Sequence, residues 1–163
     1  HPLAMCGLHA LDSCRIEKGF RHFGHDISNE DHVLEAGLGF AVKENKPAGK
    51  FGTMIGADAV KAKRNDGLTR RLMQFRLADP DPLLYHNEAI YRDGEVIGFL
   101  TSGNYGHHIG AAIGLGYVKC ATAGETAQQQ LQSKYQIDVA GQLVDAEVSF
   151  SPMYDPKSTK IKL

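Results

Sequence analysis

The sequence predicts an α+β protein in which a short helix-and-strand segment precedes a mostly antiparallel Greek-key β-barrel. Two observations support this fold class. The spacing of apolar residues changes from helical to alternating near Gly67. Beyond that point the predicted strands are short and numerous, which is typical of small barrels and sandwiches. We therefore divide the chain into residues 1–67 and residues 68–163.

A short helix is expected near the N-terminus. Ala10, Cys14 and Glu17 form a row at helical spacing. Gly19 follows at the position where a left-handed residue commonly ends a helix. Because Cys14 shares the row of Ala10, we expect it to pack in the core as a small apolar side chain.

Two further elements are predicted before the change of pattern. Residues 34–43 alternate in the manner of a strand, and residues 54–63 have the spacing of a short helix. Leu38, Phe40 and Val42 are the alternating residues of the strand, and Ile55, Ala59 and Ala62 are expected to face inward from the helix.

The second part of the chain is dominated by strand patterns. Residues 68–77 alternate, with Met73, Phe75 and Leu77 on one face. Residues 89–102 form a hairpin around Asp93-Gly94, a pair typical of two-residue turns. The remaining predicted elements are a strand over residues 113–120, a capping box at Thr122-x-x-Glu125 opening a short helical turn through Leu131, and a closing hairpin over residues 137–150 around Gly141-Gln142.

Composition excludes several classes of function. The 163-residue chain has a formal net charge of −1 and no basic block, which argues against a nucleic-acid partner. It has no apolar run long enough to span a membrane. Its three cysteines form no C-x-x-C pair, which favours a reducing compartment and argues against a zinc site. The pairs His22-x-x-His25 and His107-His108 have no acidic or cysteine residues grouped around them, so we expect no metal site.

The sequence shows neither a signal peptide nor a familiar catalytic motif. The first residues lack the charged and apolar regions of a signal peptide and an initiator methionine, which is consistent with a chain that begins inside a longer polypeptide. The sequence holds no complete dinucleotide fingerprint, phosphate-binding loop or nucleophile elbow.

Glu17 is the side chain that most needs an explanation. It places a carboxylate on a row of small apolar residues, and Arg15 is two positions away, too close along a helix to face it. A carboxylate on an apolar face requires hydrogen-bond donors from elsewhere. Two interpretations remain open. Glu17 pairs with a distant Arg or Lys or reaches water, or it receives a ligand edge that carries two parallel N–H groups.

Seven blocks in order across nearly the whole chain resemble the folate-binding family typified by the glycine-cleavage T-protein, an aminomethyltransferase. The blocks are Arg15-Ile16-Glu17-Lys18-Gly19-Phe20-Arg21-x-x-Gly24-His25-Asp26, Leu34-Glu35-Ala36-Gly37-Leu38-Gly39-Phe40, Ile55-Gly56-x-x-Ala59-Val60, Ile90-Tyr91-x-x-Gly94-Glu95-x-x-Gly98, Thr101-Ser102-Gly103-x-Tyr105-Gly106, Gly114-Leu115-Gly116-Tyr117-Val118 and Pro152-Met153-Tyr154-Asp155-Pro156. The Glu-Lys-Gly and Tyr-Asp-Pro forms are most similar to the C-terminal region of FAD-linked dimethylglycine and sarcosine dehydrogenases.

The resemblance implies a tetrahydrofolate site. It implies that residues 1–67 are the C-terminal part of a folate-binding aminomethyltransferase domain and that residues 68–163 are its C-terminal barrel. The glutamate at the position of Glu17 would receive the 2-amino and N3–H edge of the pterin. Lys43 and Lys46, with Arg71 or Arg70 as alternatives, would hold the glutamate tail of the folate, and Glu35 could instead be structural.

Departures from the family pattern limit what this chain can do alone. The resemblance implies that the catalytic aspartate of the family lies in an N-terminal region that this chain lacks. An FAD domain would lie in that missing region too. We therefore assign no catalytic residue and expect the chain alone to be inactive. The parent would be a tetrahydrofolate-dependent one-carbon transfer enzyme in the bacterial cytoplasm or mitochondrial matrix. The alternatives are a non-catalytic assembly module and a piece of a free-standing T-protein.

Overall fold

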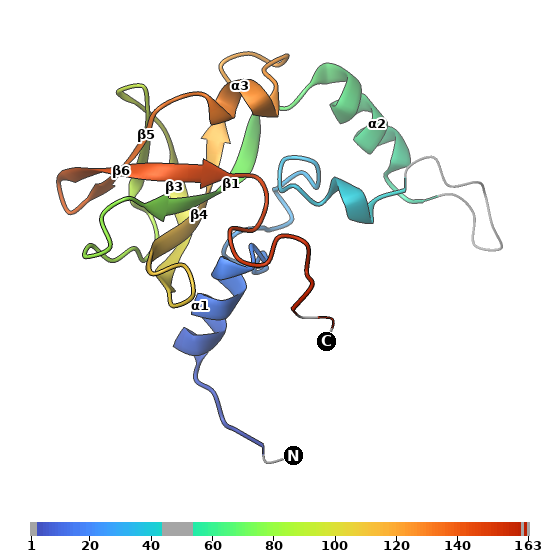
Figure 1. Ribbon diagram of the computed structural model, residues 1–163. Coiled ribbons are helices and arrows are strands. Elements are labelled where there is room, and N and C mark those ends of the chain that lie inside the picture. The colour runs from blue at the N-terminus through green and yellow to red at the C-terminus, as the bar shows by residue number, and fades with distance from the viewer. Residues whose placement is uncertain (1–2, 44–53, 161, 163) are drawn as a thin grey trace.

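The computed structural model describes residues 3–43, 54–160 and 162. Figure 1 shows a β-barrel with α1 beneath it, α3 at its upper end and α2 to one side. In chain order the elements are α1 (Leu8–Glu17), the 3-10 helix η1 (Gly39–Ala41), α2 (Ala57–Asp66), β1 (Arg70–Leu77), β2 (Ala89–Arg92), β3 (Glu95–Gly106), β4 (Ala111–Lys119), α3 (Ala127–Leu131), β5 (Tyr135–Val139) and β6 (Gln142–Ser149).

The six strands close into one antiparallel barrel with the order β1-β4-β3-β2-β5-β6. The consecutive strands β2, β3 and β4 form a meander, and β1 lies beside β4 rather than beside β2. This is the Greek-key arrangement. The α+β fold class and the antiparallel Greek-key barrel predicted from the sequence are confirmed.

Both predicted hairpins form, and the chemistry of their turns explains why. Asp93 and Gly94 have φ values of 51° and 90°, the left-handed pair that a two-residue turn requires between twisted strands. Between β5 and β6 the corresponding pair is Ala140 and Gly141, with φ values of 53° and 85°. The second turn therefore lies one residue earlier than the predicted Gly141-Gln142.

The core of the barrel follows the alternation of β1. Met73, Phe75 and Leu77 are buried inside it, as predicted, together with residues such as Ile90 and Ile137 from the other strands. The opposite face of β1 is also covered. Leu72 joins a second cluster beneath the barrel, whose other buried members are Ile16, Ile113, Leu115 and Tyr117. Because Ile16 belongs to α1, this second cluster joins the helix to the barrel wall.

Helix α1 buries only one narrow side. Ile16 is fully buried, and the Ser13 hydroxyl donates to the Tyr105 carbonyl of β3 over 2.7 Å. Gly19 ends the helix with φ at 64°, as predicted. Cys14 is exposed, so the prediction that it packs in the core is wrong. The helix meets the barrel through the row of Ser13 and Ile16 and turns Cys14 away from it.

The predicted strand over residues 34–43 does not form. The segment turns at Gly37, which has φ at 70°, and then makes the short helix η1. Phe40, one of the alternating residues, is 83% exposed. Gly37 lies directly against the Arg21 guanidinium, and the Arg21 Nε donates to the Ala36 carbonyl over 3.0 Å. These contacts hold the segment in its turned conformation.

Two details of the helices also differ from prediction. Helix α2 begins at Ala57, after Gly56 in the left-handed region, and buries Ala57 and Val60 instead of the predicted row that included Ile55. Ile55 lies before the helix and is fully exposed. The capping box is formed by Thr126 and Gln129 instead of Thr122 and Glu125.

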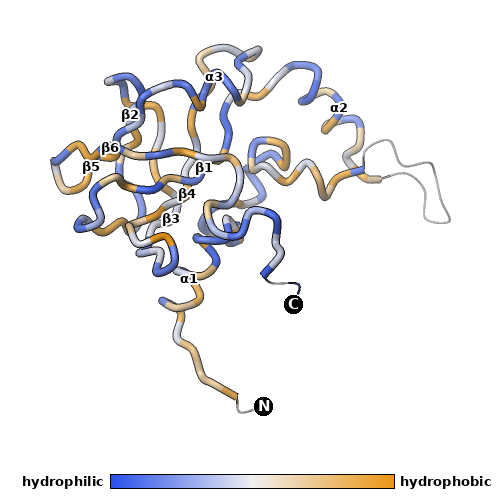
Figure 2. Tube along the Cα trace, in the orientation of Figure 1, coloured by the Kyte–Doolittle hydropathy of each residue, from blue (hydrophilic) through white to orange (hydrophobic). Residues whose placement is uncertain are grey.

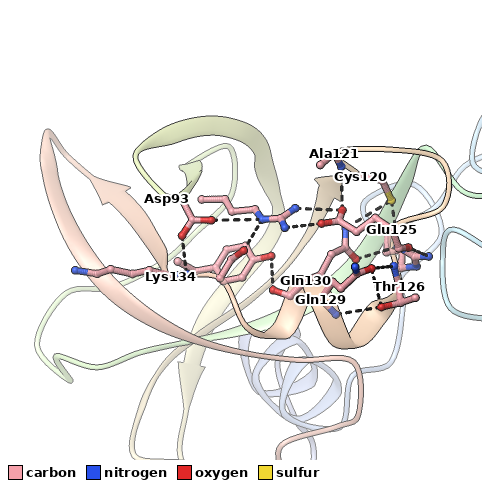
Figure 3. A network of polar contacts seen from close by, with 12 residues as sticks. Asp93, Cys120, Ala121, Glu125, Thr126, Gln129, Gln130 and Lys134 are labelled. Atoms are coloured by element: carbon pink, nitrogen blue, oxygen red, sulfur yellow. Dashed lines mark hydrogen bonds and ion pairs between the residues drawn. The ribbon is translucent and has the colours of Figure 1, made fainter.

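Glu125 instead forms an ion pair with Arg92 at the end of the barrel. Its carboxylate pairs with the Arg92 guanidinium at 2.5 Å and accepts from the Ala121 amide at 2.9 Å. Figure 3 shows Glu125 between Ala121 and Cys120 on one side and Gln130 on the other. The ion pair lowers the pKa of Glu125 and anchors α3 to β2.

Candidate functional site

An open groove of about 830 Å³ follows the side of α1 that faces away from the barrel. Much of its wall is apolar, and exposed hydrophobic residues continue into the segment before the helix (Figure 2). The apolar lining residues include Leu8, Leu11, Cys14, Phe20 and Phe23. The polar lining residues include Glu17, Lys18, His22, His108 and Tyr154. The groove is thus an apolar surface with ionisable groups at one end.

Glu17 lies at that end with its carboxylate held by the turn between β3 and β4. The Oε1 atom accepts from the backbone amides of His108 at 2.6 Å and Ile109 at 3.1 Å. The Oε2 atom lies 3.2 Å from the His108 Nδ1. The expectation that Glu17 needs donors from a distant part of the chain is confirmed, but the donors are amides and an imidazole, not an Arg or Lys.

Glycines make this arrangement possible. A Cβ atom on Gly106 would lie 3.1 Å from the Glu17 Oε1, so a side chain at this position would crowd the carboxylate. Gly110 closes the turn with φ at 77°, and its amide donates to the Gly106 carbonyl over 2.7 Å. The turn thereby presents two successive N–H groups to one oxygen, an arrangement suited to binding anions.

The C-terminal segment packs against the same end of α1. The Lys18 ammonium donates to the carbonyl and carboxylate of Asp155, and the Tyr154 amide donates to the Glu17 carbonyl over 3.3 Å. Burial of the Asp155 carboxyl opposes ionisation, but hydrogen bonds from Thr159 and Lys18 outweigh it and lower the pKa of Asp155 to about 2. The Tyr154 amide satisfies one carbonyl group at the helix end, and the Tyr154 ring lies 4.5 Å from the His108 ring.

Arg15 fixes the orientation of α1 from the other side. Its guanidinium donates to Asp26 at 2.7 Å, to Asp12 at 2.7 Å and to the Ser102 hydroxyl of β3 at 2.9 Å. Asp26 is fully buried and also accepts from the Thr101 hydroxyl at 2.6 Å. Because Glu17 is two residues beyond Arg15, this network holds the helix that carries the groove carboxylate.

The two described residues that were proposed for the folate tail, Lys43 and Arg71, lie outside the groove beside Glu17. Lys43 is exposed and, like Arg71, does not line the groove. Lys46 lies outside the described residues. The Arg71 guanidinium donates to the Gln130 side chain at 3.1 Å and to the Glu125 carbonyl at 2.7 Å, in the α3 region drawn in Figure 3. The role of these three cations remains a prediction.

Other cations reach the groove instead. Lys18 and Arg21 both line it, and both also line a neighbouring apolar hollow of about 480 Å³. Burial lowers the pKa of Arg21, an effect that the charge of Asp26 opposes. Sequence reasoning missed these two residues, and it weighed His108 only as a metal ligand. The glycines at positions 106 and 110 around the histidine pair were the available signal.

The alternative cation Arg70 is committed to a structural cluster around Glu35. Glu35 is buried and pairs with Lys63 of α2 at 2.7 Å and with Arg70 of β1 at 3.2 Å. The Arg70 guanidinium also binds Asp31 at 2.7 Å. The possible structural role of Glu35 noted from the sequence agrees with these contacts, which join the segment before η1 to both α2 and the barrel.

Acid titration tests the Glu35 cluster. Burial opposes ionisation of Glu35, but hydrogen bonds from Lys63, Thr69 and Arg70 outweigh it and lower its pKa from 4.5 to about 2. The cluster therefore stabilises the fold above the unfolded-state pKa and loses this contribution as the pH falls toward about 2. In calorimetric scans, Glu35→Gln should be less stable at neutral pH and should lose less on acidification. Parallel plots of Tm against pH for the two proteins would contradict this prediction.

Among the described residues there is neither a metal-binding cluster nor a helix that could span a membrane. Within residues 3–43, 54–160 and 162, no three His, Cys, Asp or Glu side chains are grouped so as to hold a metal ion. The rings of His22 and His25 lie 4.5 Å apart without such company. In the same part of the chain, none of the helices has the length and apolar character to cross a membrane.

Two family profiles match the chain. The glycine cleavage T-protein C-terminal barrel domain matches residues 70–155, and the GCVT N-terminal domain matches residues 1–46. The chain belongs to the glycine cleavage T-protein family. The resemblance inferred from the sequence blocks is therefore confirmed.

Relatives of two kinds share this family. Over 98% of its length the chain is 38% identical to a 4-methylaminobutanoate oxidase (formaldehyde-forming) of Paenarthrobacter nicotinovorans, and over 99% it is 32% identical to human mitochondrial sarcosine dehydrogenase. It spans only 18% and 17% of those proteins. An aminomethyltransferase of Geobacillus sp. (strain WCH70) is 32% identical over 91% of the chain, which spans 38% of that enzyme.

A solved structure supports the fold. The glycine cleavage system aminomethyltransferase T from Bartonella henselae superposes with a TM-score of 0.74. The match covers 92% of this chain and 39% of that protein at 24% identity. The T-protein family fold therefore extends over the helical segment as well as the barrel.

Proposed function

We propose that this chain is the C-terminal part of a tetrahydrofolate-dependent one-carbon transfer enzyme that is joined to an FAD-dependent dehydrogenase of N-methyl amines such as dimethylglycine or sarcosine. Membership of the T-protein family supports the folate role. Relatives named as sarcosine and dimethylglycine dehydrogenases, of which the chain spans a small share, support the link to a longer oxidising enzyme. The proposed location is the bacterial cytoplasm or the mitochondrial matrix.

The observation that carries the proposal is the position of the Glu17 carboxylate. It is buried, yet it lies in the wall of a groove of about 830 Å³. Phe20 and Phe23 in the same wall are 54% and 70% exposed, so their rings are free to contact a planar ligand. A pterin has this shape, and its edge carries N–H donors. Hydrogen bonds to a charged acceptor contribute about 1.5–3 kcal/mol each.

The chain's own residues would bind and orient the folate rather than perform the transfer. Glu17 would fix the pterin edge, and the aromatic residues would exclude water from one of its faces. Tetrahydrofolate, when bound, supplies the acceptor for the one-carbon unit. Lys43 and Lys46 remain the proposed partners of the folate tail, whereas Arg71 would first have to leave its contacts near α3. We assign no catalytic residue to this chain.

Titration of the complete polypeptide with 5-formyltetrahydrofolate, a reduced folate that resists oxidation, tests this function. Glu17→Gln should raise the calorimetric Kd by about tenfold or more, because one charge-assisted hydrogen bond is lost. Glu147→Gln is the matched control, since that carboxylate is exposed on β6 and lies outside the groove. Absence of binding by the unchanged protein would overturn the proposed function, and an unchanged Kd for Glu17→Gln would overturn the role of Glu17.

An assembly module is the second candidate. Leu8 and Leu11 of α1 are 79% and 54% exposed, which suits a helix that packs against another part of a larger protein. The Glu17 carboxylate is also already bonded within the chain. A protein that binds no reduced folate but needs Leu8 and Leu11 to assemble would favour this function. For a piece of a free-standing T-protein, the preceding sequence would lack a dinucleotide fingerprint.

A further inference from the structure

The His108 side chain contacts the carboxylate oxygen of Glu17 that a ligand would need. Three donors reach the carboxylate, and two of them are backbone amides that share the Oε1 atom. A carboxylate oxygen has about two lone-pair sites, so the amides fill the capacity of Oε1. The Oε2 atom is left for a ligand, and the His108 Nδ1 lies 3.2 Å from it.

The two kinds of donor differ in how easily they can leave. The amides belong to the turn between β3 and β4, which Gly106 and Gly110 close with a backbone hydrogen bond of 2.7 Å. The His108 side chain is 60% exposed, whereas that of Glu17 is 3% exposed. Rotation of the imidazole into solvent leaves the two amide bonds intact. The carboxylate therefore stays in position when the ring moves away.

We propose that His108 is a positioning residue that gates Glu17 by competing with the ligand for the Oε2 atom. The inference rests on the proposed folate function and deepens it. A ligand must offer an N–H donor at Oε2 to replace the imidazole, so the gate discriminates against ring systems whose edge carries acceptors alone. Tyr154, whose ring lies 4.5 Å from that of His108 at 34°, provides an aromatic contact beside the gate.

The size of the effect follows from exposure. A carboxylate's contact with an exposed side chain is worth little, no more than the about 0.2–1 kcal/mol of an exposed ion pair, which corresponds to a change in Kd of up to about fivefold. When only a fraction of the protein is in the state that can bind, the apparent Kd rises in inverse proportion to that fraction. Removal of the imidazole should therefore tighten binding by a few-fold, in contrast to the loss expected for Glu17→Gln.

The test is calorimetric titration of the complete polypeptide with 5-formyltetrahydrofolate. His108→Ala should bind about threefold to fivefold more tightly than the unchanged protein, because the competitor for Oε2 is gone. His108→Asn keeps an N–H donor near Oε2. It should remain gated, with a Kd close to that of the unchanged protein.

His107→Ala is the matched control, because His107 is exposed on the same turn and makes no contact with Glu17 among its described interactions. It should bind as the unchanged protein does. If His108→Ala leaves Kd unchanged while Glu17→Gln still loses binding, the gate is refuted and the folate function stands. If the unchanged protein binds no folate, the proposed function fails and the gate fails with it.

Discussion

Replacing Arg15 with methionine is expected to lower the free energy of unfolding by about 3–5 kcal/mol, the usual cost of breaking a buried ion pair. The Arg15 and Asp26 side chains are 11% and 0% exposed, so removal of the guanidinium leaves the Asp26 carboxylate buried without its cation. The Ser102 hydroxyl also loses its donor from Arg15. Thermal and chemical unfolding of the purified protein measure this loss.

A double-mutant cycle separates the ion pair from lost packing. Asp26→Asn removes the buried charge, so the pair Arg15→Met with Asp26→Asn should cost less than the sum of the single changes. Asp12→Asn is the control on the same guanidinium, since Asp12 is 34% exposed and its pairing with Arg15 is worth no more than about 1 kcal/mol. Strict additivity in the cycle would contradict the role given to the Arg15–Asp26 pair.

The same substitution links stability to the groove. Arg15 joins α1 to β3 and to the loop that carries Asp26, and Glu17 follows two residues later on the helix. We expect Arg15→Lys to weaken the proposed folate binding as well as the fold, because a single ammonium cannot reproduce the forked contacts of a guanidinium. The proposed site would then depend on a residue that holds the helix.

Local chemistry explains which elements could be predicted from the sequence. The Asp93-Gly94 turn and the Gly19 helix end need only their own residues, because each requires a left-handed conformation that these residues adopt readily. The inner face of β1 also follows from its alternation alone. Such features are encoded within a few residues and are visible without knowledge of their neighbours.

Distant contacts explain the predictions that were wrong. The alternation over residues 34–43 does not produce a strand, and the Arg21 side chain, which binds the Ala36 carbonyl and lies against Gly37, stabilises the turn found there instead. Thr122-x-x-Glu125 and Thr126-x-x-Gln129 both have the spacing of a capping box. Glu125 is bound by Arg92, 33 residues away, which leaves the second pair to cap α3. No local pattern could have decided between them.

Both local pattern and distant contacts determine the arrangement around Glu17. The sequence showed that Glu17 needs external donors, because a carboxylate on an apolar row cannot remain unsatisfied. It could not show that the donors come from residues 108 and 109, which are 91 and 92 positions away. Closure of the barrel brings the turn between β3 and β4 to the end of α1. The groove carboxylate and its gate are therefore products of the tertiary fold.

Phe75→Ala is expected to be the other severe change, at about 3–5 kcal/mol, since truncation of a buried aromatic ring loses its transfer free energy and leaves a cavity. Phe75 lies on β1 between β4 and β6, is fully buried, and meets the Tyr135 ring edge-on at 6.0 Å. The cavity would lie where these strands close the barrel. Calorimetric unfolding should show a large fall in Tm for this variant.

Phe99→Ala provides the matched control, because it removes the same ring from β3 at a position that is 57% exposed. It should change the free energy of unfolding by about 0.5 kcal/mol or less, as surface substitutions commonly do. Equal losses for the two variants would contradict the assignment of the barrel core. Below its Tm, Phe75→Ala should leave the proposed folate binding unchanged in Kd, because Phe75 packs inside the barrel and does not line the groove beside α1.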